Sequence, residues 1–268
     1  MRQDELRIPQ EGAKYLLVLL LTQYRPTTIN MGVEVLLVPQ GPTPASTLQK
    51  LGERYRTARL RALREDPDAF SSTYEREVQF EPEEWVKRLQ NPEAKTFVAI
   101  RLPAADTETG EPLSVSHAEK LAENEWLGMI VLIGPRTLSP ADCLTPWKPF
   151  TTSQKDGNAT TSTFADQEIT YFAVSMFVFR EMRRQGLGRK LIEISLDTAR
   201  QDAASLKATK LTIGLVLAAE NTAAMDLYRK CGFVLLPPDP NLANLAKSTD
   251  EGISGMGRTL ELTPTDES

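Results

Sequence analysis

The chain has 268 residues, of which 41% are hydrophobic and 25% are charged, with a formal net charge of -5 and an isoelectric point near 5.2. This composition is typical of soluble globular proteins, and the length allows one large domain or two small ones. The acidic balance argues against a general affinity for nucleic-acid phosphates, which requires an excess of lysine and arginine. We therefore expect no nucleic-acid partner.

Residues 1–31 differ from the rest of the chain and are predicted to be an N-terminal extension of unknown role. Their apolar run, 15–21, is too short to span a bilayer and lacks the cleavage site of a signal peptide. We expect no membrane partner and a cytoplasmic location, with the nucleus as an alternative. The extension could be an added strand, a dimer contact, or a stretch upstream of a start at Met31.

Hydrophobic patterning predicts the first elements in chain order. A strand spans residues 32–38, and a helix spans 46–65, with Ser46 or Thr47 as its N-cap. Further elements are a helix at 81–90 and strands at 96–102 and 126–134, the strands separated by a polar connection. Residues 135–167, rich in proline, serine and threonine, are predicted to form a long loop with little regular structure.

The second half begins with an apolar run at 169–179 that is rich in tyrosine, phenylalanine and valine, which predicts a buried strand. The elements that follow are a helix from 187 to about 204, a strand at 211–217, a helix at 222–230, and strands at 233–236 and 256–262. The two cysteines, Cys143 and Cys231, are too far apart in sequence for a metal or redox motif, so we expect thiols and no metal.

Residues 183–189 read Arg-Arg-Gln-Gly-Leu-Gly-Arg and lie between the buried strand and its following helix. Two glycines allow backbone N–H groups to close on an anion, at a helix N-terminus whose dipole favours negative charge. Guanidinium groups around the loop would match phosphate oxygens. The loop alone is equally compatible with a plain strand-to-helix turn.

Two nucleotide motifs are excluded by the residues of this loop. A Walker A motif would need glycine at position 183, where Arg183 stands, and a Lys-Ser/Thr pair after Gly188. A dinucleotide fingerprint would need a small residue at position 191, which is Leu191. The loop therefore fits neither nucleotide motif, and the phosphate-binding and plain-turn interpretations both stay open at this point.

A second block contains Asn221, Ala224, Leu227-Tyr228 and Gly232-Phe233. Val178 and residues 183–189, which we call the glycine loop, precede this block. Together these features make the chain resemble the GNAT superfamily of acyl-CoA-dependent N-acyltransferases over roughly residues 32–262. Residues 60–70, Leu-Arg-Ala-Leu-Arg-Glu-Asp-Pro-Asp-Ala-Phe, resemble the early helix and loop of many members. The resemblance implies an α/β (α+β) fold: the GNAT fold, with a single mixed central sheet of about six to seven strands flanked by helices.

The resemblance also implies that acetyl-CoA is the cosubstrate and that backbone N–H groups of the loop hold its pyrophosphate. The end of the strand would pair with the pantetheine arm, and the N–H of Val178 would face the thioester oxygen, where such a donor contributes about 3 kcal/mol. The cofactor-binding residues expected in this way are Phe177, Val178, Phe179, Arg183, Arg184, Gln185, Gly186, Leu187, Gly188, Arg189, Asn221 and Ala224.

Tyr228 matches the family position whose hydroxyl protonates the departing CoA thiolate, although a tyrosine on the inner face of a helix is often simply core. Asn221 fits both an N-cap and a contact with the cofactor arm. For the general base the candidates are Glu168, which we place in the catalytic set with Tyr228, and Asp166. His117, the only histidine, is expected to be a solvated loop residue.

These inferences predict an N-acetyltransferase domain at residues 32–262 and a C-terminal tail at 263–268. The predicted reaction moves an acetyl group from acetyl-CoA to a primary amine by direct attack. Two alternatives remain: a non-catalytic acyl-CoA-binding module, and a peptide or protein acetyltransferase acting on histones or N-termini. The acceptor amine and the oligomeric state stay open, with a homodimer as one option.

Overall fold

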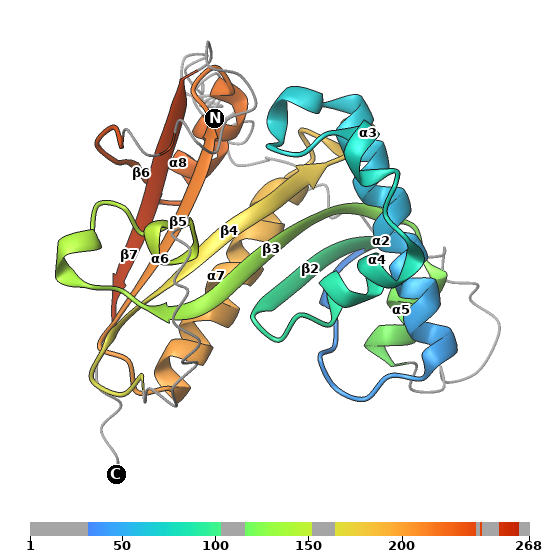
Figure 1. Cartoon of the computed structure of the whole chain (residues 1–268), viewed down its shortest axis with the longest axis horizontal. Coiled ribbons are helices and arrows are strands. Elements are labelled where there is room, and N and C mark those ends of the chain that lie inside the picture. The colour runs from blue at the N-terminus through green and yellow to red at the C-terminus, as the bar shows by residue number, and fades with distance from the viewer. Residues whose placement is uncertain (1–31, 103–115, 152–163, 240–241, 243–251, 263–268) are drawn as a thin grey trace, which may run out of the picture. The chain divides into compact units, whose positions relative to one another are not determined.

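The computed structural model describes residues 32–102, 116–151, 164–239, 242 and 252–262 (Figure 1). The strands of these residues form one seven-stranded sheet in the order β1-β2-β3-β4-β5-β7-β6. Only β4 and β5 run parallel; the other neighbours are antiparallel. The predicted single mixed sheet is confirmed. Its strands are β1 (Val33–Leu37), β2 (Ala94–Arg101), β3 (Trp126–Thr137), β4 (Glu168–Val178), β5 (Lys210–Ala218), β6 (Val234–Leu235) and β7 (Ile253–Glu261).

Helices cover both faces of the sheet. One face packs against α7 and α8 through a cluster that includes Leu191 and Met225, and the other packs against α2, α4 and α5 through a cluster that includes Leu51, Trp85 and Leu121. In Figure 1, α7 crosses behind the central strands. The described helices are α2 (Ala45–Glu65), α3 (Tyr74–Glu77), α4 (Pro82–Leu89), α5 (His117–Glu123), α6 (Lys148–Thr151), α7 (Leu187–Ser205) and α8 (Thr222–Lys230), with 3-10 turns η1 (Pro67–Ala69), η2 (Pro140–Asp142) and η3 (Arg180–Met182).

Two local predictions are corrected by the structure. The N-cap of α2 is Pro44, which makes no side-chain cap, so Ser46 and Thr47 lie inside the first turn. The fixed φ of proline favours the extended conformation that precedes a helix, so the helix starts earlier than the hydroxyl residues indicated. The polar connection after β2 contains the unpredicted helix α5, which begins with a capping box between Ser116 and Glu119.

The predicted loop at 135–167 is also corrected in its described part, because β3 extends to Thr137 and η2 and α6 follow. Residues 138–151, which we call the strap, pack onto the sheet through Trp147, whose side chain is buried. The Trp147 indole N–H donates to Asp239 at 3.1 Å. A Cβ on Gly255 of β7 would lie 2.0 Å from the indole ring, so this glycine makes room for the strap. Residues 152–163 lie outside the described residues.

Candidate active site

The parallel strands β4 and β5 separate partway along their length. Their pairing runs from Glu168 opposite Lys210 to Ala173 opposite Leu215 and ends there. Beyond that point β5 continues with β7 and β4 continues with β3 as far as Val178. Figure 1 shows the two strands diverging toward their C-terminal ends. Between residues 174 and 178, β4 therefore has no strand partner on its β5 side within the described chain, and we call this its open edge.

A β-bulge changes the direction of β4 within the open edge. Ile130 of β3 faces two residues of β4, Ser175 and Met176, and Ser175 has a φ of 54°. Gly128 of β3 allows the bulged strand to approach, because a Cβ there would lie 2.6 Å from the carbonyl oxygen of Phe177. No pattern in the sequence indicated this bulge.

The backbone of Val178 points toward the open edge. The N–H of Phe179 donates to the carbonyl of Leu127 on β3 at 3.0 Å. Because successive residues of a strand direct their polar groups to opposite sides, the N–H and carbonyl of Val178 point away from β3. The Val178 carbonyl accepts a hydrogen bond from Arg183 Nε at 2.8 Å. The neighbouring rings of Phe177 and Phe179, 5.3 Å apart between centroids, belong to the cluster beneath α2.

The glycine loop ends at the N-terminus of α7. Gly186 is the N-cap, with a left-handed φ of 80°, and Arg184 is also left-handed at 63°. No side chain caps the helix, so the N–H groups of its first turn, which starts at Leu187, remain directed at the loop. A Cβ on Gly188 would lie 3.0 Å from Leu227 and 3.4 Å from Met176, so this glycine lets α7 pack against α8 and β4.

The charged and polar side chains of the loop differ in whether they already have an ion-pair or hydrogen-bond partner. Arg183 pairs with Asp66 at the end of α2. Arg189 pairs with Glu193 at 2.6 Å, and the Lys190 ammonium donates to the Val33 carbonyl at 3.2 Å. Gln185 donates through its side-chain amide to the Glu181 carbonyl at 3.0 Å. Arg184 is exposed and has no ion pair with any residue that the structure describes, so it is the loop cation with the most freedom to meet an anion.

Asn221 and Tyr228 lie on α8, which the sequence predicted with the correct bounds. The side-chain oxygen of Asn221 accepts from the N–H of Ala224 at 3.1 Å, so Asn221 is the N-cap. Tyr228 is 6% exposed and meets the Phe233 ring edge-on, at 5.4 Å between centroids. Burial, assisted by the neighbouring Cys231 thiol, raises the pKa of Tyr228 well above its usual value, so the phenol keeps its proton.

The predicted general bases lie at the other end of β4. Glu168 is ten residues before Val178, roughly 30 Å away along an extended strand, and it pairs with Lys210 at 3.6 Å. Asp166 precedes it in a left-handed turn conformation. If the amine lies beside Val178, as proposed below, both carboxylates are out of its reach. His117 is exposed, as expected, but starts α5 instead of lying in a loop.

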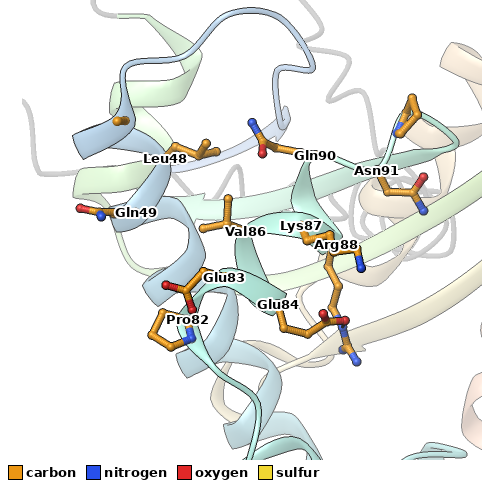
Figure 2. A pocket seen from close by; sticks show the side chains of 12 residues that line it. Leu48, Gln49, Pro82, Glu83, Glu84, Val86, Lys87, Arg88, Gln90 and Asn91 are labelled. Atoms are coloured by element: carbon orange, nitrogen blue, oxygen red, sulfur yellow. Dashed lines mark ion pairs between the residues drawn. The ribbon is translucent and has the colours of Figure 1, made fainter.

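A groove of about 750 Å³ lies between α2 and α4, on elements that do not take part in the open edge (Figure 2). Its lining includes the apolar side chains of Leu48 and Val86 and the charged side chains of Glu83, Glu84 and Lys87. Nothing in these residues connects the groove with the glycine loop or with Tyr228. We therefore place the candidate active site at the open edge of β4 and not in this groove.

The described residues offer neither a metal cluster nor a membrane-spanning helix. No three His, Cys, Asp or Glu side chains among them come together in a way suited to a metal ion. None of the helices in the described ranges has the length and apolar character needed to cross a membrane.

Comparison with known proteins connects these features with one enzyme family. Residues 154–235 match the family model described as the acetyltransferase (GNAT) domain. This range contains β4, the glycine loop, α7, β5 and α8. No curated protein matches the chain.

Several solved structures resemble the chain at low identity. NAA60 of Arabidopsis thaliana, in complex with a bisubstrate analogue, shares 12% identity over 87% of this chain and 100% of its own, with a TM-score of 0.45. A GNAT-family acetyltransferase from Streptococcus pneumoniae shares 15% over 85% and 99%, also at 0.45. The spermidine N-acetyltransferase of Vibrio cholerae, with CoA and spermine, shares 14% over 86% and 96%, at 0.43. Similarity at this level does not identify the acceptor.

Proposed function

We propose, from the match of residues 154–235 to the family model of the GNAT acetyltransferase domain, that the protein is an N-acetyltransferase that moves the acetyl group of acetyl-CoA to a primary amine. The observation that carries this proposal is the open edge of β4 beside the uncapped N-terminus of α7. An extended, amide-containing arm can add to a free strand edge through main-chain hydrogen bonds. A pyrophosphate suits the N-terminus of a helix with left-handed residues before it.

In the proposed reaction the amine nitrogen attacks the thioester carbonyl carbon, and the C–S bond then breaks to release CoA. Negative charge collects on the carbonyl oxygen in the transition state. The N–H of Val178 is the proposed donor to this oxygen, since it points into the open edge. A fixed donor at such a position contributes about 3 kcal/mol to lowering the barrier. The amine must arrive neutral, and its proton leaves to solvent or to a base that we do not assign.

We propose that Tyr228 supplies the proton that the departing thiolate takes up. Burial keeps the pKa of this phenol high, so the proton is in place at any physiological pH. A phenol with this raised pKa is a weaker acid than a thiol, whose pKa is near ~8.5, so full transfer of its proton to the free thiolate is unfavourable on its own. Tyr228 would therefore act mainly as a hydrogen-bond donor to the sulfur as negative charge grows there, and any proton that it gives to the thiolate is replaced by the proton that the amine loses.

The remaining cofactor contacts are proposed as follows. Backbone N–H groups from Arg184 to Arg189 hold the pyrophosphate, with the Arg184 side chain as an added cation. Phe177 to Phe179 offer backbone groups to the pantetheine arm. Because the oxygen of the Asn221 side chain is used in capping α8, its amide nitrogen is the group left to donate to the arm. Gln185 and Leu187 contribute through the backbone at the start of α7, and Ala224 contributes through its methyl group, because its N–H already donates to Asn221.

The proposal is tested by measuring CoA release with a thiol reagent in the presence of acetyl-CoA and a panel of amines. The panel contains polyamines, aminoglycosides, free amino acids, and peptides with free N-termini or lysine side chains. Turnover on any member supports an acetyltransferase, and the pattern identifies the acceptor class. Tight acetyl-CoA binding by calorimetry with no turnover on any amine would instead support a non-catalytic acyl-CoA-binding module. Turnover on peptides alone would support a peptide or protein acetyltransferase.

The role of Tyr228 is tested by Tyr228→Phe, which keeps the ring that packs against Phe233. We expect kcat to fall about 100-fold or more, the usual contribution of a proton donor, with little change in the dissociation constant of acetyl-CoA. Tyr171→Phe is the matched control. Tyr171 lies on β4, seven residues before Val178, and its buried hydroxyl donates to Asp202 at 3.1 Å. The variant therefore removes another buried hydroxyl on the same strand. Equal kcat values for the two variants would refute the role of Tyr228.

A further inference from the structure

The end of α2 is tied to the glycine loop by ion pairs between residues that are far apart in sequence. Asp66, the C-cap of α2, accepts hydrogen bonds from Arg183, 117 residues later, and from Arg180 at 3.2 Å. Beside them, Arg61 of α2 donates to Glu181 at 2.7 and 2.9 Å. The early block of residues 60–70, whose role the sequence did not explain, thus lies against the start of the glycine loop.

One side chain of this group also contacts the open edge directly. The Arg183 guanidinium bonds to Asp66 through Nη2 and to the Val178 carbonyl through Nε, at 2.8 Å. The planar guanidinium has a fixed fork of donors, so the two bonds hold the carbonyl in a defined direction relative to α2. The Val178 carbonyl and the Val178 N–H emerge from the same side of β4. The two groups belong to the two peptide planes that meet at the Cα of Val178, so a bond that holds the carbonyl fixes one of these planes and favours the extended conformation that keeps the N–H on the same side.

The connection between α2 and α3, residues 66–73, also contacts the side chains at the end of β4. Phe70 meets the ring of Phe177 edge-on, at 6.3 Å between centroids. The Arg59 guanidinium lies 4.5 Å above the Phe70 ring and forms a buried ion pair with Glu77. The connection is thus linked to β4 in two ways. Asp66 reaches the Val178 carbonyl by way of Arg183, and Phe70 contacts the Phe177 ring directly.

We propose that Asp66 and Arg183 are positioning residues for acyl transfer. In this arrangement the carboxylate of Asp66 orients the Arg183 guanidinium, which in turn holds the Val178 carbonyl and so keeps the end of β4 extended, with the Val178 N–H facing the thioester oxygen. The inference rests on the proposed function and gives it a residue outside the matched domain. It also reassigns the Arg183 side chain, which the sequence predicted as a ligand of the pyrophosphate, to the alignment of the strand.

Burial raises the pKa of Asp66, but the hydrogen bonds and charges of Arg183 and Arg180 outweigh burial and hold the pKa below its usual value. The carboxylate is therefore charged at neutral pH. Its side chain is 27% exposed and that of Arg183 is 40% exposed, and ion pairs with this much solvent contact add little to stability. Loss of the pair should therefore change catalysis more than melting temperature.

The test uses the full chain with Asp66→Asn, Asp66→Glu and Arg183→Lys, each measured for kcat, KM, acetyl-CoA dissociation constant and melting temperature. Arg183→Lys keeps the charge but removes the Nε donor to Val178. We expect kcat to fall about 10-fold in Asp66→Asn and Arg183→Lys, because a misplacement of less than 1 Å already slows a reaction. We expect the acetyl-CoA dissociation constant to stay within about 2-fold, and Asp66→Glu to recover part of kcat.

Arg180→Gln is the matched control, since Arg180 also contacts Asp66 but has no hydrogen bond to Val178; its kcat should equal that of the wild type. If Arg183→Lys instead weakens acetyl-CoA binding with kcat unchanged, Arg183 binds phosphate and the inference is wrong. A loss of kcat that follows a matching loss of melting temperature would make the pair merely structural. Wild-type turnover with unaffected variants overturns this inference alone, whereas no turnover by the wild type overturns the proposed function as well.

Discussion

Replacing Gly128 by alanine tests whether the exact path of the β4 backbone controls acyl transfer. The new Cβ would stand 2.6 Å from the carbonyl oxygen of Phe177 and 3.1 Å from Cα of Val178. Both are backbone atoms, so no side-chain rotation relieves the contact. The strands must separate by about 0.7 Å to reach the ~3.3 Å of an ordinary carbon–oxygen contact.

Such a shift has a cost in stability and a larger cost in rate. Overpacking of this kind destabilises a fold by about 1–3 kcal/mol. Because a misplacement of about 1 Å can slow a reaction 100-fold, we expect kcat of Gly128→Ala to fall about 10- to 100-fold. The pyrophosphate contacts lie on the glycine loop, so the acetyl-CoA dissociation constant should change much less. Steady-state kinetics, calorimetry and thermal unfolding measure the three quantities.

Gly41→Ala is the matched control for this substitution. A Cβ on Gly41 has no atom within 4 Å, and the residue does not adopt a positive φ. Its kinetics and melting temperature should therefore equal those of the wild type. If Gly128→Ala retains wild-type kcat together with a lowered melting temperature, the strand shifts without effect on the reaction, and the proposed role of Val178 would be refuted.

The remaining predictions concern the loop and the buried ion pair. Gly186→Ala should lose about 1–2 kcal/mol, because alanine resists the left-handed conformation although no atom blocks it; chemical denaturation measures the loss, and Gly186→Asn should recover part of it. Glu77→Gln should lose about 3–5 kcal/mol at pH 7, since it leaves Arg59 buried without its counter-ion. Burial raises the pKa of Glu77, but the bonds from Arg59 and the charge of Arg88 outweigh it and lower the pKa. The contribution of Glu77 is then complete above the unfolded pKa, near ~4.3, and is lost as the pH falls through the lower folded pKa. The stabilities of wild type and Glu77→Gln should converge in acid, and a constant difference at all pH values would contradict the ion pair.

Much of the fold could be predicted because its elements carry local signals. The helix at 222–230 has an N-cap asparagine and an apolar face, and the strand ending at Val178 is a continuous apolar run. Helix α5 also carried a local signal, the Ser116–Glu119 capping box, but its length of seven residues concealed the apolar period. The strap was missed because Pro146 and Trp147 pack against Gly214 of β5 and Gly255 of β7, two glycines that are far away in the sequence.

The candidate site was predictable only where its function depends on backbone. The glycine loop and its left-handed Gly186 follow from residue type. The bulge at Ser175 depends on the register with β3, and the Asp66–Arg183 pair depends on how α2 ends beside the loop; both arise from tertiary structure. Glu168 was a reasonable candidate base by residue type, but it precedes the strand predicted at 169–179 and so lies at the opposite end of β4 from Val178.

Trp147 lies within the strap and packs on the sheet, so its fluorescence reports on this segment. The chain has three tryptophans, and all of them are buried. Trp85 and Trp126 belong to the cluster under α2, whereas Trp147 belongs to a separate cluster with Phe172 and Leu242. The difference in fluorescence between the wild type and Trp147→Phe therefore reports on the strap alone. Measuring this difference during titration with acetyl-CoA, and then with an amine, would show at which step the strap responds.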